Sequence, residues 1–107
     1  MKRSGGLCEA MLPPVCVGRA LEASHRINRK MGGRHGAARQ SVDRLSALLH
    51  VCRACHRWLH ENPTAARLRG LQIVEGMDPA SIPLILRGEL VYLDDVGGVH
   101  PYEQAGA

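Results

Sequence analysis

Aromatic side chains are scarce in this 107-residue sequence, and long apolar runs are absent. Phenylalanine does not occur, and aromatic residues make up only 3% of the chain. Because a chain of this size buries only roughly two-thirds of its unfolded surface, a core without large side chains needs another source of stability. No segment approaches the roughly 18 consecutive apolar residues of a membrane span. We therefore expect a single domain over residues 1–107, located in the cytoplasm and without membrane contact.

Acidic side chains are scarce in the first part of the chain. Residues 1–69 carry 13 Lys and Arg against 4 Asp and Glu, whereas residues 70–107 carry 1 against 6. These counts give +9 and −5, which together equal the net charge of +4. A basic segment of this kind favours a polyanionic partner such as nucleic acid, although a solvated basic surface without a partner has the same composition. We divide the expected domain into a basic metal-binding core, residues 1–70, and an acidic hairpin extension, residues 71–107.

The pattern of apolar, glycine and proline residues predicts an α+β protein. Glycines and basic residues are interspersed over residues 28–40, which indicates a surface loop whose backbone can approach phosphate. Asn62-Pro63 is typical of a helix start and Gly70 of a helix end. The expected elements are a short strand within residues 19–27, helices over 42–49, from Cys52 to near Glu61 and from Pro63 to Gly70, and a hairpin with strands at 84–86 and 90–93.

The four cysteines suit a metal site better than disulfides. Cys52 and Cys55 form a C-x2-C pair, and Cys8 and Cys16 are the other two thiols. Four thiolates at tetrahedral positions are a preferred ligand set for structural zinc. In a reducing compartment, an even number of cysteines indicates metal ligands before disulfides. We predict a structural Zn²⁺ held by all four cysteines, with buried free thiols or a disulfide as the alternatives.

Two histidines follow the C-x2-C pair at helical spacing. His56 and His60, at i and i+4, share one face of the predicted helix and can direct two imidazoles at one ion. Because the adjacent Cys55 and His56 cannot easily serve the same tetrahedral ion, the spacing predicts two centres, one of sulfur and one of nitrogen. Two solvated helix histidines are the alternative. His25 stands apart upstream, and a lone histidine is more often structural than catalytic.

Several short motifs occur in a fixed order along the chain. They are Gly-Leu-Cys8-Glu, Ser24-His25-Arg26, Gly32-Gly33, Cys52-x2-Cys55-His56-x3-His60, Asn62-Pro63, Arg87-Gly88-Glu89 and Leu93-Asp94-Asp95. Together they resemble the HNH endonuclease family, most closely the small HNH proteins of actinobacterial phages, over nearly the whole chain. The cysteine and histidine motif is the specific part of this resemblance. The glycines and the C-terminal motifs support it.

The resemblance implies a ββα-metal (His-Me finger) core with a four-cysteine zinc knuckle and a C-terminal β-hairpin. It also implies a metal-dependent DNA endonuclease that hydrolyses phosphodiester bonds. On this hypothesis His25 is the general base that deprotonates water, because the ordinary pKa of histidine, about 6.5, suits proton transfer at neutral pH. His56 and His60 hold a catalytic divalent ion, which is Mg²⁺, Mn²⁺, Ni²⁺ or Zn²⁺. The four cysteines hold the structural zinc.

Basic side chains follow the proposed base closely, and they can bind DNA phosphates without reading bases. The predicted DNA-binding residues are Arg26, Arg29, Lys30, Arg34 and Arg39. DNA is therefore the expected partner. The resemblance to phage proteins adds terminase or other packaging proteins as expected partners, and the host cytoplasm as the expected location.

Three positions depart from the family pattern. Met11 stands where relatives have the second cysteine of the first pair, so Cys16 must substitute. Ser24 stands where relatives often have a third metal ligand, and Ala47 where they have the asparagine that braces the base. The departures at Ser24 and Ala47 support a second hypothesis, a catalytically weak or inactive zinc module that binds DNA or a packaging partner. A disulfide-bonded secreted protein is a third.

Overall fold

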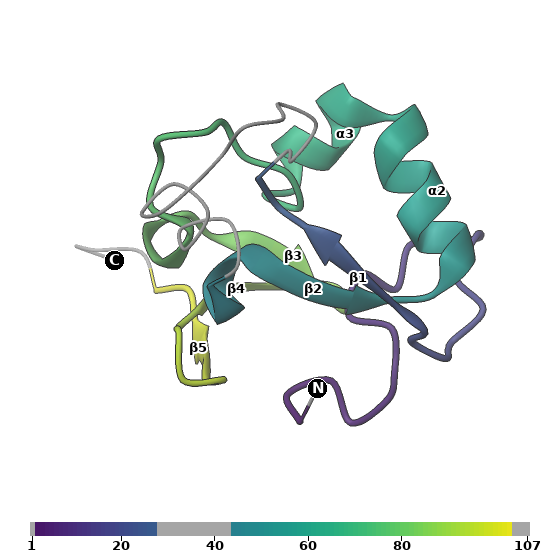
Figure 1. The fold of residues 1–107 in the computed structure, drawn as a ribbon, viewed down its shortest axis with the longest axis horizontal. Helices are drawn as coiled ribbons and strands as arrows, with labels where there is room; N and C mark the ends of the chain where they lie inside the picture. The colour runs from purple at the N-terminus through teal and green to yellow at the C-terminus, as the bar shows by residue number, and fades with distance from the viewer. Residues whose placement is uncertain (1, 28–43, 104–107) are drawn as a thin grey trace.

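The computed structural model describes residues 2–27 and 44–103, which form a small α+β fold (Figure 1). Within these residues, two antiparallel β-sheets lie beside two short α-helices. Neither of these helices is long and apolar enough to cross a membrane. The elements are the strands β1 (Glu22–His25), β2 (Leu48–Val51), β3 (Leu84–Leu86), β4 (Glu89–Leu93) and β5 (Val99–Pro101), the helices α2 (Arg53–Glu61) and α3 (Pro63–Leu68), and the 3-10 turns η1 (Leu45–Ala47) and η2 (Pro79–Ser81).

The first sheet pairs β1 with β2 and leads directly into α2. The antiparallel register places Ser24 opposite Leu49 and His25 opposite Leu48. Cys52 alone separates β2 from α2, so the three elements are adjacent in space (Figure 1). The short strand predicted within residues 19–27 is confirmed as β1. Its last residue, His25, therefore stands close to the helix that carries the other two candidate histidines.

The helix predicted over Val42–Leu49 is wrong for the part of it that the structure describes. Leu45–Ala47 form one 3-10 turn, and Leu48–Val51 form β2. Leu49 and Val51 are fully buried while the residues beside them are half-buried, which is the period of two that a strand has. Over so few residues, the apolar pattern does not distinguish a helix from a strand. The hydrogen-bonded pairing with β1 shows that these residues form a strand.

Helices α2 and α3 begin and end close to the predicted residues. Cys52 caps α2, and its Sγ accepts the backbone N–H of Cys55 at 3.3 Å. Pro63 opens α3, where its missing N–H breaks no helical hydrogen bond. Gly70 has a φ of +70°, and a Cβ at this position would overlap the carbonyl oxygen of Pro83. Glycine is therefore required where the chain leaves α3.

The predicted C-terminal hairpin is confirmed as β3 and β4, which are joined by Arg87 and Gly88. Both turn residues have a positive φ, 51° and 83°, which matches the twist of a tight hairpin. Strand β5, which the sequence does not predict, pairs with β4 to complete a three-stranded sheet. The side chain of Asp94 accepts the backbone N–H groups of Val96 and Gly98 and shapes the turn into β5.

One aliphatic core connects both sheets and both helices. Cys8, Cys52 and Cys55 are fully buried in it. Because strands β3 and β4 contribute side chains to the same core, the acidic C-terminal part packs directly against the basic part. The other buried members are Ala10, Leu12, Leu49, Val51, Leu59, Ala66, Leu71, Leu84, Leu86, Val91 and Leu93.

Arg26 lies inside the protein, with 0% of its surface exposed. Its guanidinium donates hydrogen bonds of 2.7–2.9 Å to four backbone carbonyls, those of Ser46, Gly70, Pro79 and Ile82. Burial, together with the nearby charge of Arg3, lowers the pKa of Arg26 to about 10. This corrects the prediction that Arg26 contacts DNA phosphates, because nearly all of its N–H groups are already used within the fold.

Replacing Arg26 should therefore destabilise the protein. We expect Arg26→Ala to lower the free energy of unfolding by roughly 3–5 kcal/mol, because it leaves several buried carbonyls without donors. Urea denaturation followed by circular dichroism measures this change. The control is Arg19→Ala, which removes an exposed arginine and should change stability by less than about 0.5 kcal/mol. An Arg26→Ala protein as stable as the parent would contradict the buried role.

Candidate functional site

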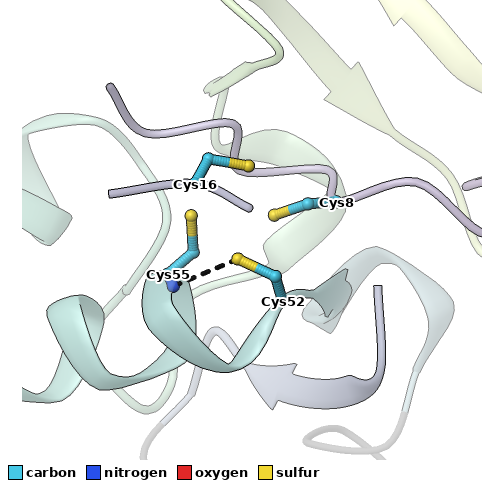
Figure 2. A group of neighbouring side chains, drawn as sticks. All are labelled: Cys8, Cys16, Cys52 and Cys55. Atoms are coloured by element: carbon cyan, nitrogen blue, oxygen red, sulfur yellow. Dashed lines mark hydrogen bonds between the residues drawn. The ribbon is translucent and has the colours of Figure 1, made fainter. Parts of the chain in front are cut away.

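Four cysteine side chains from two parts of the chain meet at one point (Figure 2). Their Sγ atoms all lie within 4.8 Å of one another. Four sulfurs bound at about 2.3 Å to one zinc ion stand about 3.8 Å apart, so a small contraction brings this cluster to tetrahedral coordination. The cluster could therefore bind one zinc ion. Its members are the predicted ligands Cys8, Cys16, Cys52 and Cys55.

The helix start and the crowding of sulfur atoms shift the thiol pKa values in opposite directions. Burial raises the pKa of Cys55, and the neighbouring thiols of Cys52 and Cys8 raise it further. Burial acts in the same direction on Cys52, but hydrogen bonds from the backbone N–H groups of Val17 and Cys55 outweigh it and lower the pKa to about 7. A divalent cation at the cluster would favour the thiolate form of all four residues.

The enlarged loop between Cys8 and Cys16 closes through backbone hydrogen bonds. The N–H of Cys8 donates to the carbonyl of Gly18, and that of Cys16 to the carbonyl of Leu12, both at 2.8 Å. The loop therefore brings Cys16 to the fourth corner of the cluster. Met11, at the position where the resemblance leads us to expect a cysteine, is 49% exposed and lies at the surface.

Two arginines hold this loop in place, and the sequence predicts this role for neither of them. Arg3 forms a buried ion pair with both carboxylate oxygens of Glu9, at 2.7 and 2.9 Å. Arg87, in the β3–β4 turn, donates to three carbonyl oxygens of the loop, those of Ser4, Leu7 and Cys8. Because Arg87 is remote in sequence from the carbonyls it contacts, no local motif could have indicated this support.

The three histidines predicted for catalysis line one cleft of about 700 Å³. His25 comes from the end of β1, and His56 and His60 come from α2. Helix α3 and the segment after it complete the wall. Cys55 belongs to the sulfur cluster and the next residue, His56, to the cleft. The structure thus has the two separate groups that the spacing of these residues predicts.

The histidine pair on α2 has a geometry that fits a chelated ion. The Nε2 atoms of His56 and His60 lie 3.2 Å apart. Two nitrogens bound at about 2.1 Å to one ion stand roughly 3.0–3.4 Å apart, depending on the coordination geometry. Oε1 of Glu22 lies 2.8 Å from Nδ1 of His56. This carboxylate orients the ring and leaves Nε2 for a ligand.

No third protein ligand joins the histidine pair within residues 2–27 and 44–103. In that part of the chain, the four cysteines are the one group of three or more candidate ligands close enough to share an ion. Ser24, where the resemblance leads us to expect a third ligand, lines the cleft and is only 3% exposed. An ion held by the histidines would therefore complete its coordination with water or substrate oxygens.

The basic residues predicted to bind DNA are placed only in part. Arg26 is buried, and the other four lie outside the described residues: Arg29, Lys30, Arg34 and Arg39. Arg67, which the sequence analysis does not identify, is exposed on α3 and lines the cleft. No motif marks Arg67, because its place beside the histidines depends on how α3 packs against α2.

Comparisons of this chain with protein-family models, with curated proteins and with solved structures found no match. The resemblance to the HNH family therefore rests on the sequence motifs alone.

Replacing one cysteine of the α2 pair should abolish zinc binding. We expect Cys52→Ser to lose both the zinc ion and cooperative unfolding, because the sulfur site supplies stability that the small core lacks. Elemental analysis should find one zinc in the parent and none in the variant. Met11→Cys, which adds a thiol at the exposed position, is the control and should leave one zinc bound. Full retention of zinc by Cys52→Ser would refute the four-cysteine site.

Proposed function

We propose that the protein is a metal-dependent DNA endonuclease of the HNH type, with a ββα-metal core formed by β1, β2 and α2. The observation that carries this proposal is the cleft shared by His25, His56 and His60. These histidines come from two elements that are far apart in the sequence, and the motif resemblance assigns the same three residues to catalysis. Such a cleft has the groups that phosphodiester hydrolysis requires, a base and a metal-binding pair.

His25 acts as the general base in this proposal. It accepts a proton from water as the water oxygen attacks phosphorus and the bond to the 3′ oxygen breaks. The family braces this region with an asparagine, which Ala47 replaces. The backbone next to His25 is nevertheless fixed, because the carbonyl of Ala47 accepts the N–H of Arg26 at 2.7 Å. The buried Arg26 guanidinium further fixes the residue that follows His25.

His56 and His60 hold the catalytic divalent ion in this proposal, which is Mg²⁺, Mn²⁺, Ni²⁺ or Zn²⁺. When bound, such an ion supplies Lewis-acid stabilisation of the charge that develops on the phosphate and leaving oxygens. The 3.2 Å separation of the two Nε2 atoms supports this role. Glu22 supports it further by holding the ring of His56 through Nδ1.

The sulfur cluster fixes the helix that carries these ligands. Cys52 and Cys55 lie at the start of α2, and His56 follows directly. A zinc ion on both cysteines would set the rotation of α2 about its axis, since each residue advances the helix by about 100°. His60 then returns to the same face one turn later. Through Cys52 and Cys55, a structural zinc would orient the catalytic pair without taking part in the reaction.

A catalytically weak or inactive zinc module, which binds DNA or a packaging partner such as terminase, is the second candidate. Its support is that, among the described residues, no third His, Cys, Asp or Glu lies close enough to share an ion with the histidine pair. Both candidates bind DNA through phosphates. Cleavage distinguishes them.

Plasmid nicking tests the proposal. We expect the purified protein to nick supercoiled plasmid in the presence of Mg²⁺, Mn²⁺ or Ni²⁺ and to stop when EDTA is added. His25→Ala should reduce the rate by roughly 10²–10⁴, the range for a positioned acid or base, while metal affinity is unchanged. His60→Ala should lose the ion. Isothermal titration with Mn²⁺ or Ni²⁺ separates these two effects.

His100→Ala provides the matched control, because His100 lies outside the cleft and contacts Asp94 in the β4–β5 turn. It should cut as fast as the parent. If His25→Ala also cuts as fast as the parent at saturating metal, His25 is not the base. A parent protein that binds DNA and never nicks it would support the second candidate instead.

A further inference from the structure

Arg67 is an exposed arginine on the wall of the histidine cleft, and the proposed mechanism does not use it. The other arginine on that wall is Arg26, whose guanidinium is committed to backbone carbonyls. Among the described residues, Arg67 is therefore the one permanently charged side chain that the cleft offers to a ligand. Its charge is opposite to that of a phosphodiester.

Hydrogen bonds at both ends of helix α3 hold it in position beside the cleft. At the corner with α2, Nδ2 of Asn62 donates to the carbonyl of Trp58 at 3.0 Å. After α3, Nε2 of Gln72 donates to the carbonyl of Leu59 at 3.2 Å. The segment that follows α3 also forms a parallel bridge, between Ile73 and Ile27, two residues after β1 ends. Helix α2 and the residues just after β1 thus hold α3 and the segment after it, so the position of Arg67 relative to the cleft histidines is defined.

Within the described part of the chain, the guanidinium of Arg67 has no hydrogen-bond or ion-pair partner. Two nearby arginines, Arg69 and Arg53, differ from it in this respect. Arg69 lies over the ring of Trp58, at 5.3 Å from its centroid, and Arg53 lies 3.7 Å from a carboxylate oxygen of Glu22. Arg67 is therefore available to a ligand without first breaking a contact with another of the described residues.

We propose that Arg67 binds a phosphate of the DNA strand that enters the cleft, an inference that rests on the proposed function. The planar guanidinium offers paired N–H groups that match two phosphate oxygens, and such charge-assisted pairs are stronger than neutral hydrogen bonds. Arg67 would hold the strand against the cleft while the histidines face the bond to be cut. Arg67 would contribute to DNA binding and would take no part in proton transfer.

DNA binding by the zinc-loaded protein, with no other divalent ion added, tests this inference apart from cleavage. With a fluorescent duplex and anisotropy detection, Arg67→Ala should weaken binding by roughly tenfold or more. The slope of log affinity against log salt should fall by about 0.9, as for one lost phosphate contact. The matched control is Arg57→Ala, which removes an exposed arginine of α2 outside the cleft and should change affinity by less than about twofold. Arg67→Lys should keep the salt slope, because it keeps the charge, and should bind with intermediate affinity.

The outcomes separate this inference from the nuclease proposal. If Arg67→Ala binds as tightly as Arg57→Ala, with an unchanged salt slope, the inference is overturned even if the parent cuts DNA. If the parent never nicks plasmid but Arg67→Ala alone loses binding, the phosphate site stands and the nuclease proposal fails. Zinc content and melting temperature should equal those of the parent in all variants. A loss of zinc in both Arg67 variants would make Arg67 a structural residue and overturn the inference.

Discussion

The meeting of four thiols at one point is the constraint on which the rest of this structure depends. The cluster joins the N-terminal loop to the start of α2, inside a core made of short aliphatic side chains without a single phenylalanine. A bound zinc ion would supply the stability that aromatic packing gives to other small domains. It would also determine which face of α2 meets the cleft, because Cys55 and His56 are neighbours. Stability and site geometry therefore depend on the same residues.

Several arginines of this chain stabilise the fold and are therefore not available to a nucleic acid. Arg3 and Arg26 are buried, and Arg87 binds three carbonyls of the cysteine loop. Long loops leave many carbonyl groups without partners in a sheet or helix, and a guanidinium supplies several donors at once. The charge asymmetry of the sequence therefore overstates the basic surface that is open to DNA. Arg67 gains importance because it is exposed beside the histidines.

The parts of the fold that the sequence predicts are those with local signals. The C-x2-C pair and Asn62-Pro63 mark α2 and α3, and the turn at Arg87-Gly88 marks the hairpin. Strand β2 is mistaken for a helix because its strand character depends on pairing with β1, and β5 is missed because it depends on β4. The same limit applies to the site. Spacing predicts the cysteine cluster and the histidine pair, whereas the contact of Glu22 with His56 and the burial of Arg26 arise only from tertiary packing.

Metal removal from the purified parent protein tests most directly whether the sulfur cluster holds the structure together. The amide spectrum recorded by NMR reports the folded state at every residue, with the thiols kept reduced throughout. We predict that chelation of zinc collapses the dispersed spectrum and that one equivalent of Zn²⁺ restores it, because metal binding and folding are coupled in small domains of this kind. A metal-free, reduced protein that keeps its dispersed spectrum would show that the aliphatic core alone specifies the fold, and it would contradict the dependence on the four cysteines.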